Sequence, residues 1–431
     1  MRIAFYTLGC KVNQYETQAL EQLFTQRGHS LVPFEGAADV YIINTCTVTA
    51  VSDRKSRQII RRARKEAPDA VIAVCGCYPQ THPEDMEALS IDLVSGTGDR
   101  LGFVELVEQA ARERQPINAL DDAMKRLDFE VLPAGGLEGR TRAMLKVEDG
   151  CVNFCTYCII PYARGRIRSL PLERAVEQAK ALWEQGYQEI VLTGIEISSW
   201  GQEWRDGSGL IDLIEGICNA VPNCRIRLGS LEPRTITEEF CRRAAGLPNL
   251  CPHFHLSMQS GCDTVLKRMN RKYDTARYAE SIRLLREYFR NPGITTDLIV
   301  GFPGETEEEF GQTLDFIRSC AFSAMHVFPY SKRPGTPAAA RKDQILNAVK
   351  EERAHRAAAA AREMEEQYLS QWVGETVPVL WEEEREGAWR GYTAQYSPVA
   401  VQSAENLHNQ VHAVRLERLE QGILWGSLES F

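Results

Sequence analysis

The chain has 431 residues, of which 44% are hydrophobic, 25% are charged and 8% are aromatic. These are ordinary globular values, so they exclude a wholly disordered chain and a collagen-like rod. Lys and Arg number 50 against 59 Asp and Glu, a net charge of −9. This balance argues against nucleic-acid binding through overall positive charge but leaves room for a local basic face.

The first residues and the hydropathy of the chain indicate whether it is secreted or inserted into a membrane. The sequence has no run of about 18 apolar residues, so we expect no transmembrane helix. The opening MRIAFYTLGC has too short an apolar stretch for a signal peptide and is predicted to be a first strand. We therefore expect a cytoplasmic protein with no membrane partner. Its 13 cysteines are then metal ligands, catalytic groups or core residues rather than disulfides.

The first section, residues 1–136, alternates strand and helix signals. Short apolar runs lie at residues 2–8, 40–44, 70–74 and 91–96, and helical stretches lie at about 13–27, 51–67 and 101–114. Short apolar strands between amphipathic helices are typical of a parallel sheet that is covered on both faces. We predict a doubly wound parallel α/β domain, followed by a linker with Gly and Pro at residues 115–139.

The second section, residues 140–369, repeats the strand–helix rhythm six times. The candidate strands are AMLKVE, EIVLTG, RIRLGS, HFHLSM, TTDLIVGF and MHVFPYS. Six units are too few to close an eight-unit barrel, so we predict an incomplete (β/α)6 barrel. Thr306 and Glu309 have the spacing of a helix capping box. An Ala-rich helix at about 343–369 connects this barrel to the last section.

The third section, residues 370–431, contains short β-like runs separated by turn residues. These runs are TVPVLWE, WRGYTAQY, VAVQS, QVHAVRLERL and GILWGSLE. Five short strands in so short a stretch predict a small closed β-barrel of the oligonucleotide-binding kind. The expected fold is therefore a multidomain α/β chain with a parallel sheet domain, a partial barrel and a small β-barrel.

The densest chemical signal is a C-x3-C-x2-C run formed by Cys151, Cys155 and Cys158. It directly follows the first strand of the predicted barrel, and such folds place their chemistry on the loops after strands. Iron–sulfur clusters usually take four ligands, so three thiolates can bind three irons of a cubane and leave the fourth iron open. The alternatives are a zinc site without a nearby fourth ligand, or three buried thiols.

This run, with Tyr157 directly before its last cysteine, resembles the radical S-adenosylmethionine (SAM) superfamily. The resemblance covers the six-unit middle section. It implies that the open iron of a 4Fe-4S cluster binds the amino and carboxylate groups of SAM. It also implies that reduction of the cluster cleaves SAM to a 5′-deoxyadenosyl radical, which removes hydrogen from an unactivated C–H bond.

A second set of cysteines follows the predicted strands of the first section. Cys10, Cys46 and Cys77 each lie just past the end of a strand, and the strand ends of a doubly wound sheet share the edge where ligands bind. These three can therefore converge within metal-bridging distance. Cys75 competes with Cys77, which we prefer because Gly76 indicates that the chain has left the strand. The alternative is that all are buried small hydrophobic residues, as we expect for the cysteines of the barrel outside the first triad.

Three segments carry a more specific resemblance: LGCKVNQYET (residues 8–17), NTCTVT (44–49) and CGCYPQ (75–80). With the SAM cysteine run and the terminal β-barrel, they look like the methylthiotransferases over essentially the whole chain. The resemblance implies that Cys10, Cys46 and Cys77 bind an auxiliary 4Fe-4S cluster. It also implies that the last domain, called TRAM in this family, recognises an RNA or protein substrate.

Within the family, GCKVNQYE resembles the branch that acts on N6-threonylcarbamoyladenosine at position 37, next to the anticodon of tRNA. The isopentenyladenosine branch carries a Gln-Met-Asn type sequence after the first cysteine and the ribosomal-protein branch a Pro-Lys-Asn type. Lys11, Val12 and Asn13 match neither. The implied reaction uses two 4Fe-4S clusters and SAM to form the 2-methylthio derivative. One SAM donates a methyl group to sulfur at the auxiliary cluster, and a second yields the radical that removes the hydrogen from C2 of the adenine.

The position of further residues at barrel strand ends points to cofactor contacts. Gly194 and Glu196 follow the second strand, where radical SAM enzymes carry a Gly-Gly-Glu-like motif for the SAM amino group. Ser230 and Glu232 follow the third strand and Gln259 the fourth, all at the mouth where chemistry is expected. With Tyr157, these residues are the candidate SAM contacts, although a strand-end turn would give the same Gly-x-Glu pattern.

Clusters of basic residues indicate an RNA partner, whereas the acidic charge of the last domain argues against one. A helix after Cys46 carries seven basic residues, and Arg164, Arg166 and Arg168 follow the SAM cysteines. We expect phosphate contacts from such clusters, with Arg164 and Arg166 as substrate-binding residues and a tRNA anticodon stem-loop as partner. The family also implies an electron donor of the reductase or flavodoxin type. From residue 374 to the end, the sequence has nine acidic and four basic residues. A domain with this negative charge would suit a basic ribosomal protein as the substrate.

Three alternatives to this function therefore remain. Two lie within the family: methylthiolation of a ribosomal-protein side chain, or of isopentenyladenosine in tRNA. The third is a non-catalytic RNA-binding module stabilised by zinc, although the sequence lacks the separated close cysteine pairs that such modules usually carry.

Overall fold

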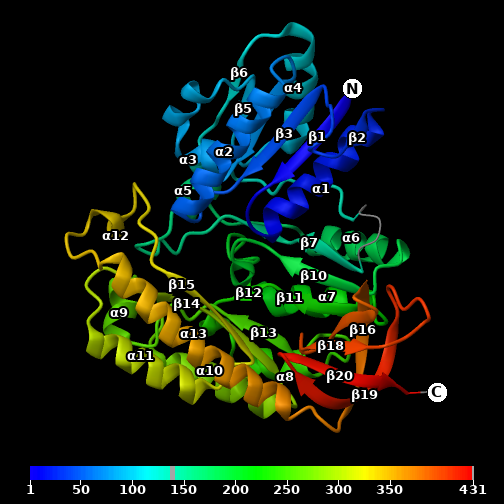
Figure 1. Ribbon diagram of the computed structural model, residues 1–431, viewed down its shortest axis with the longest axis vertical. Helices are drawn as coiled ribbons and strands as arrows, with labels where there is room; N and C mark the ends of the chain where they lie inside the picture. The colour runs from blue at the N-terminus through cyan, green and yellow to red at the C-terminus, as the bar shows by residue number, and fades with distance from the viewer. Residues whose placement is uncertain (136–140, 430–431) are drawn as a thin grey trace.

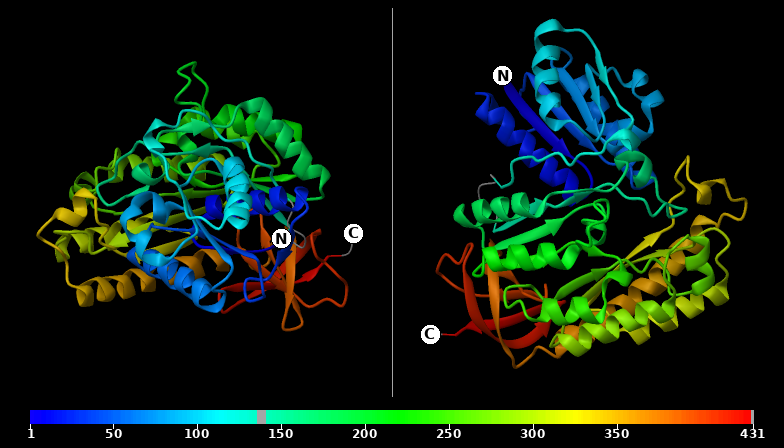
Figure 2. Two further views of the ribbon diagram at one scale, coloured as in Figure 1. Left: turned by 90° about the horizontal axis from the view of Figure 1, so that it is seen from above. Right: turned by 180° about the vertical axis from the view of Figure 1, so that it is seen from behind.

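A parallel sheet domain, a partial barrel and a small closed β-barrel follow one another in the computed structural model, which describes residues 1–135 and 141–429 (Figure 1). The N-terminal sheet domain lies above the partial barrel, and the closed barrel lies beside the lower part of the partial barrel (Figures 1 and 2). This confirms the predicted fold class. No helix within the described ranges is both long and apolar enough to cross a membrane.

The N-terminal domain is built on a six-stranded sheet in the order β2-β1-β3-β4-β5-β6, with every pair parallel. Its strands are β1 (Arg2–Thr7), β2 (Ser30–Val32), β3 (Val40–Thr45), β4 (Val71–Gly76), β5 (Leu93–Ser95) and β6 (Ile117–Ala119). Its helices are α1 (Lys11–Gln26), α2 (Ala50–Glu66), α3 (Cys77–Thr81) and α4 (Arg100–Glu113). The central strands β3 and β4 are buried at every residue because helices cover both faces.

Alternate residues of these strands feed two separate cores, one on each face. On one face Ile43 and Val74 pack with Ile60 of α2, and on the other Ile42 packs with Phe24 of α1. Two elements differ from the sequence prediction. The edge strands β2 and β6 are three residues long, too short to give a periodic pattern, and β6 lies where we expected only a linker. The expected boundary between the first two domains, residues 136–140, lies outside the described residues.

The middle section forms the expected open barrel of parallel strands. Its strands are β7 (Arg142–Lys146), β10 (Glu189–Thr193), β11 (Arg225–Leu228), β12 (Ser230–Leu231), β13 (His253–Leu256), β14 (Gly293–Val300) and β15 (Ala324–Pro329). The third predicted strand is divided at Gly229 into β11 and β12, so the sheet has two segments, β11-β10-β7 and β12-β13-β14-β15. The short pair β8 (Glu148–Asp149) and β9 (Arg168–Ser169) frames the loop that carries the SAM cysteines.

Helices cover the outside of this barrel and build the largest core of the molecule. They are α6 (Leu172–Glu184), α7 (Leu210–Ala220), α8 (Glu238–Ala245), α9 (Asp263–Arg268), α10 (Thr275–Tyr288), α11 (Glu307–Cys320) and α13 (Asn347–Ser370). Two short helices, α5 (Ile160–Arg164) and α12 (Pro337–Ala340), lie outside this core, and α5 packs against α3 of the N-terminal domain. The predicted capping box is present at the start of α11, where Thr306 and Glu309 exchange hydrogen bonds with each other's backbone N–H. α13 leads into the last domain, as expected.

The C-terminal domain is a closed five-stranded barrel in the order β16-β17-β18-β20-β19. Its strands are β16 (Thr376–Arg385), β17 (Ala388–Thr393), β18 (Pro398–Val401), β19 (Val411–Glu420) and β20 (Ile423–Leu428). Trp381 and Trp389 are buried in its core, so they are not free to stack on bases. The loop between β17 and β18 carries Tyr396, which stacks on Tyr392 and lies 5.2 Å from the His253 ring of the partial barrel, measured between centroids.

Candidate active site

Cys10, Cys46 and Cys77 lie at the carboxyl ends of β1, β3 and β4, three neighbouring strands of the parallel sheet. Cys10 precedes α1, Cys46 directly follows β3, and Cys77 is the first residue of α3. Cys46 and Cys77 are buried, while Cys10 is exposed. The strand-end argument therefore places these three thiols on one edge of the sheet.

Two glycines and one asparagine bring these strand ends together. A Cβ on Gly9 would lie 2.9 Å from the Cβ and 3.2 Å from the Sγ of Cys46, so only glycine permits the loop of Cys10 to approach Cys46 this closely. Gly76 has φ +100° and leaves no room for a side chain against the backbone of Thr45. The Asn13 amide Nδ2 donates to the carbonyl oxygens of Leu8 and Thr45, both at 2.8 Å, and so joins the ends of β1 and β3.

Electrostatics separates Cys77 from its neighbour Cys75. Burial raises the pKa of Cys77 to about 12, and the charges of Cys46 and Cys10 act on it in the same direction, so the three thiols are within interaction range. Cys75 instead points into the hydrophobic core between β4 and α4 and is fully buried there. This geometry supports the choice of Cys77 over Cys75 as the third member of the set.

Cys151, Cys155 and Cys158 lie together on the loop between β8 and α5. The Cys151 N–H donates to the Gly165 carbonyl at 3.0 Å, and the Cys158 N–H donates to the Cys155 carbonyl at 2.9 Å. The Thr156 N–H and hydroxyl donate to the carbonyls of Met269 and Arg268, which attaches the loop to the end of α9. Charges on Cys155 and Cys158 both raise the pKa of Cys151, so this set also lies within interaction range.

Each set offers three cysteine thiols, which is the kind of donor that iron–sulfur clusters take. Burial raises the pKa of Cys158 to about 12, so the unbound thiol is protonated, whereas metal binding requires the thiolate. A guanidinium is already in place to stabilise such a charge, because Arg271 Nη1 lies 3.3 Å from the Sγ of Cys155. Among the described residues, no three His, Cys, Asp or Glu side chains are placed to bind a single metal ion. A cubane cluster binds its cysteines on different irons, so its sulfurs stand farther apart than the ligands of one ion.

A cavity of about 270 Å³ joins the two sets of loops. Tyr157, Cys158 and Gln259 line it from the partial barrel, and Val48 and Thr49, which follow Cys46, line it from the N-terminal domain. Gln259 has φ +67°, and its backbone N–H and C=O bond to Asp297 and Ile299 of β14. The structure thus brings two predicted SAM contacts, Tyr157 and Gln259, to one cavity with Cys158.

Gly194 and Glu196 sit against a buried carboxyl group that the sequence did not reveal. Glu148 Oε2 accepts the N–H of Glu196 at 2.7 Å, and a Cβ on Gly194 would lie 2.7 Å from the same oxygen, which explains the glycine. Burial raises the pKa of Glu148 well above its usual range. Burial also raises the pKa of Glu196 to about 7, although Arg271 acts against it, and Glu196 Oε1 has no hydrogen-bond partner within the described residues.

Ser230 and Glu232 flank the same mouth but differ in their surroundings. Ser230 is exposed at the start of β12, and the buried Glu232 receives a hydrogen bond from Arg234 Nε at 2.9 Å. The backbone N–H of Glu232 donates to Ser198 Oγ at 2.9 Å, which fixes the third strand end to the loop after Glu196. Glu232 therefore has a cation partner already, whereas Glu196 has an unpaired oxygen.

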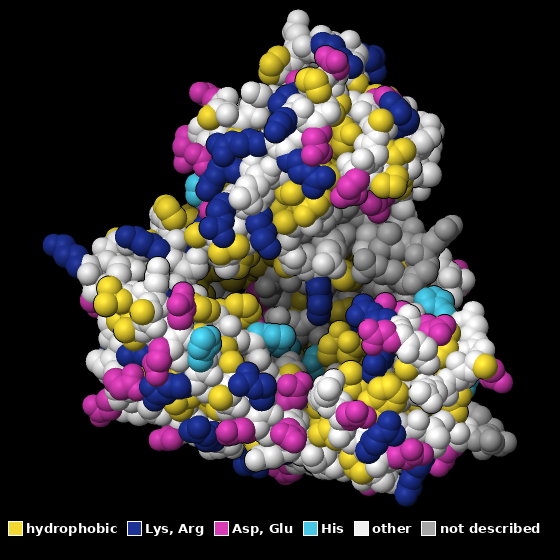
Figure 3. Space-filling model, in the orientation of Figure 1, with side chains coloured by type: hydrophobic (Ala, Val, Ile, Leu, Met, Phe, Trp, Pro, Cys, Tyr) yellow, Lys and Arg dark blue, Asp and Glu magenta, His cyan; other side chains and the backbone are white. Residues whose placement is uncertain are grey.

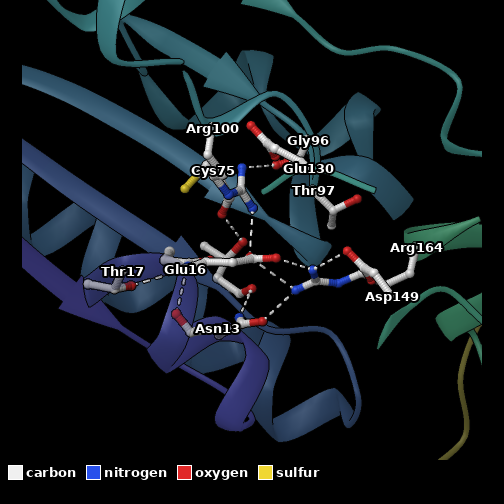
Figure 4. A network of polar contacts seen from close by, with 12 residues as sticks. Asn13, Glu16, Thr17, Cys75, Gly96, Thr97, Arg100, Glu130, Asp149 and Arg164 are labelled. Carbon is white, nitrogen blue, oxygen red and sulfur yellow. Dashed lines mark hydrogen bonds and ion pairs between the residues drawn. The ribbon is translucent and has the colours of Figure 1, made fainter. Parts of the chain in front are cut away.

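A buried ionic network joins α1 of the N-terminal domain to the first loops of the partial barrel (Figure 4). Glu16 of α1 accepts from Arg164 Nη1 at 2.5 Å, from Arg100 Nη2 at 3.0 Å and from Lys146 Nζ at 3.0 Å. Asp149, two residues before Cys151, accepts from Lys146 Nζ at 2.7 Å. Burial alone would raise the pKa of Glu16, but the three surrounding cations outweigh it and hold that pKa well below its usual range.

The network corrects the expected role of Arg164. Its side chain is fully buried, and besides Glu16 it donates to Asn13 Oδ1 at 2.7 Å, so it is not available to an RNA phosphate. Arg168 is also buried and donates to the carbonyls of Arg164 and Arg166. Arg166 is exposed. Of the two predicted substrate-binding residues, Arg166 alone keeps a placement from which it can contact RNA.

A second polar contact fixes the N-terminal domain to the far side of the barrel. Arg333, after β15, donates to Asp53 of α2 at 2.5 Å and to Thr47 Oγ1 at 2.6 Å. Thr47 follows Cys46 directly, so this contact also positions a proposed cluster ligand. Sequence reasoning missed Glu148, Arg271 and Arg333 in these roles. Arg271 belongs to a run of basic residues, Lys267, Arg268, Arg271 and Lys272, which by itself suggests phosphate contact rather than a position beside a cysteine.

Basic side chains gather on the N-terminal domain above the hollow between it and the barrel (Figure 3). On α2, Arg54, Lys55, Arg61 and Lys65 are exposed and form no ion pair with any described residue. Other basic residues of this helix are occupied, as Arg57 is by Tyr78 and Arg64 by Asp92. The outer face of α2 therefore presents positive charge that nothing within the described chain neutralises.

Comparison with known proteins finds a family match over each of the two segments that carry the cysteine sets. The Radical SAM superfamily matches residues 145–317, and the family described as Uncharacterized protein family UPF0004 matches residues 2–96. The chain is 44% identical over 426 residues to threonylcarbamoyladenosine tRNA methylthiotransferase MtaB of Bacillus subtilis, covering 96% of this chain and 93% of the relative. It is 32% identical to tRNA-2-methylthio-N(6)-dimethylallyladenosine synthase of Acetivibrio thermocellus, covering 98% and 90%.

A solved structure shares the fold at low sequence identity. The radical S-adenosylmethionine methyltransferase TsrM from Kitasatospora setae superposes with a TM-score of 0.59 at 16% identity, covering 78% of this chain and 75% of that one. This likeness concerns the arrangement of the domains and not the chemistry.

Proposed function

The chain belongs to the methylthiotransferase family of radical SAM enzymes, and from that premise we propose that it converts N6-threonylcarbamoyladenosine at position 37 of tRNA to its 2-methylthio derivative. The observation that carries this choice of substrate is the 44% identity to a relative named for it, against 32% to a relative named for the dimethylallyl nucleoside. The sequence after Cys10 supports the same branch.

Each cysteine set is a candidate binding site for one cluster. The family uses SAM and a 4Fe-4S cluster, which we assign to Cys151, Cys155 and Cys158, and we assign a second cluster to Cys10, Cys46 and Cys77. When bound, these groups supply the reductive cleavage of SAM and the sulfur chemistry, with an electron from a reductase- or flavodoxin-type donor. The protein's part is to bind, orient and shield them.

Buried cations of this chain balance the charge of both sets. Arg271 donates to Cys155, and Arg164 lies close enough to Cys77 to lower the pKa that burial has raised. The network around Glu16 contains four cations, Arg100, Lys146, Arg164 and Arg168, and two acids, Glu16 and Asp149. This surplus of positive charge stabilises a thiolate once a metal binds it, whereas burial keeps the unbound Cys77 thiol protonated.

We place Glu196 against the amino group of SAM, because its buried Oε1 has no hydrogen-bond partner among the described residues and its charge acts on the nearby Cys151. We expect Glu196→Gln to weaken SAM binding by about 10- to 100-fold, which is what the loss of one charge-assisted hydrogen bond is worth. Equilibrium dialysis of the cluster-loaded protein measures this. Glu177→Gln, on the exposed face of α6, serves as the control. Unchanged SAM affinity at unchanged iron content would remove Glu196 from the SAM site.

The tRNA would approach the face on which the hollow opens. The unpaired cations of α2 flank that hollow from the N-terminal side, and α2 begins four residues after Cys46, so phosphates held there would lie near the cluster edge. Arg166 is exposed on the loop that follows the SAM cysteines. We propose that these residues hold the anticodon stem-loop, and that the reaction takes place in the cytoplasm, where tRNA is found.

Mass spectrometry of nucleosides and proteins from a strain that lacks this chain tests the proposal. We expect 2-methylthio-threonylcarbamoyladenosine to disappear from tRNA and its unmodified precursor to accumulate, while ribosomal proteins stay unchanged. The acidic C-terminal domain favours the second candidate, a basic ribosomal protein as substrate. Loss of a methylthio mark from a ribosomal protein, with intact tRNA nucleosides, would establish that candidate and reject ours.

A further inference from the structure

A second cavity, of about 520 Å³, is lined by all three domains. Lys11 reaches it from the N-terminal domain, Arg142, Arg227 and His253 line it from the strands of the partial barrel, and Tyr396 lines it from the closed barrel. It differs from the cavity beside Tyr157 in that most of its polar residues are basic. Figure 3 shows the hollow between the domains, with basic and His side chains inside it.

The arginines of this cavity are already neutralised. Arg227 forms a two-pronged ion pair with Glu189, at 2.6 and 2.9 Å, and donates its remaining Nη1 to the Ala394 carbonyl. Arg142 pairs with Glu382 at 2.6 Å. Arg385 pairs with Glu383 at 2.8 Å. These pairs use the carboxylates of the cavity, so they leave none to match a further cation.

Lys11 is that further cation. Within the described residues its Nζ forms no hydrogen bond and no ion pair, and it faces the positive charges of Arg142 and Arg227. A second group in the cavity is also unsatisfied. His253 is 93% buried, and its Nδ1 has no partner among the described residues, whereas its Nε2 lies 3.4 Å from Thr295 Oγ1. Lys11 is exposed at the rim of this cavity, and the His253 imidazole is buried in its wall. An anionic ligand that also carries a hydrogen-bonding group would pair with the Lys11 cation and satisfy the buried Nδ1 of His253.

We infer that this cavity binds the threonyl part of the substrate nucleoside, with Lys11 pairing with its carboxylate and His253 bonding to its hydroxyl. The inference rests on the proposed function. The threonylcarbamoyl group is attached through N6 to ring atom C6, which is separated from the reacting C2 by N1 alone. A site for this group must therefore adjoin the sulfur-carrying set, and Lys11 directly follows Cys10.

The same geometry explains selection against an apolar substituent. An isopentenyl group has no charge, so its binding here would bury Lys11 and His253 without partners, and unpaired polar groups of this kind give strong discrimination. Lys11 also lies in the stretch after the first cysteine, where the sequence departs from the isopentenyl and ribosomal-protein patterns. We therefore assign Lys11 as a specificity-determining residue.

Binding of three labelled anticodon stem-loops to the cluster-loaded enzyme, without reductant, tests this inference. They carry threonylcarbamoyladenosine, its carboxyl methyl ester, or plain adenosine at position 37. We expect the wild type to bind the acid about 10- to 100-fold more tightly than the ester, and Lys11→Gln to bind both equally, with no change for plain adenosine. Lys11→Arg should restore most of the preference. Lys180→Gln, exposed on α6, controls for net charge.

Each outcome bears on one proposal or the other. Equal preference for the acid in wild type and Lys11→Gln would overturn the inference, as would a wild type that converts the acid but does not distinguish it from the ester. A wild type that fails to methylthiolate the acid at all would instead refute the proposed function. Binding of plain adenosine RNA shows that a variant is folded.

Discussion

Replacing Cys10, Cys46 and Cys77 together by alanine lowers the iron content of the anaerobically reconstituted protein from about eight to about four atoms per chain. The reason is that each set of three thiols would hold one cluster, and the two sets lie on different domains. The variant keeps Cys151, Cys155 and Cys158, so it should still cleave SAM when reduced, yet form no methylthio product. Iron and sulfide analysis measures the first effect and detection of 5′-deoxyadenosine the second.

A matched control separates cluster loss from simple loss of buried sulfur. Cys218, Cys224 and Cys251 are buried in the partial barrel and are not among the proposed ligands. Their triple alanine variant removes the same atoms and should retain about eight irons. If the Cys10, Cys46 and Cys77 variant also kept its full iron content, the auxiliary assignment would be wrong.

Glu16→Gln should cost about 3–5 kcal/mol of stability at the contact between the N-terminal domain and the barrel, the range measured when one partner of a buried ion pair is removed. Glu16 is fully buried and meets Arg100, Lys146 and Arg164, which come from both sides of that contact. Because the pKa of Glu16 lies well below its usual value, this stabilisation is complete at neutral pH. It is lost only as the pH falls through the lowered value.

Calorimetry and hydrogen exchange of the loaded protein measure this effect. We expect a lower unfolding temperature and faster exchange in α1 and α5, the helices that Glu16 and Arg164 join. The control is Glu177→Gln, which removes an exposed i,i+3 pair with Arg174 and should change stability little. If both variants behaved like the wild type, the network would not hold the domains together.

The shared position of the three N-terminal cysteines could be predicted, because that prediction requires only the order of the strands. Once β1, β3 and β4 are parallel neighbours, Cys10, Cys46 and Cys77 must share an edge, whatever the side-chain packing. The proximity of the three SAM cysteines could be predicted without any knowledge of the fold, because they lie within eight residues of sequence. The barrel strands were equally visible because each is an apolar run between amphipathic helices.

Burial could not be predicted in the same way. Arg164 is buried and Arg166 is exposed, although both belong to the same basic run. Nothing in the sequence of that run distinguishes the two residues. Arg164 is buried because Glu16, 148 positions earlier, supplies its charge partner. The Arg333 and Asp53 pair spans 280 positions. Partners this far apart leave no periodic signal, so pairing between domains emerges only in the folded chain.

The surroundings of Lys11 also could not be predicted from the sequence. The sequence after Cys10 distinguishes Lys11 from the isopentenyl and ribosomal-protein patterns, but the surroundings of Lys11 come from Arg142, Arg227 and Tyr396 of two other domains. The strands β2 and β6 escaped prediction for a different reason, since three residues at a sheet edge carry too little pattern.

The most direct test of the account is product analysis with the purified, reconstituted protein. Incubated with SAM, a reductant and an anticodon stem-loop that carries threonylcarbamoyladenosine, it should yield a nucleoside heavier by one sulfur and one methylene group, with the C2 hydrogen replaced. The Cys10, Cys46 and Cys77 variant should yield none. If the intact protein, with both clusters loaded and SAM being cleaved, left this nucleoside unchanged, the account would be contradicted.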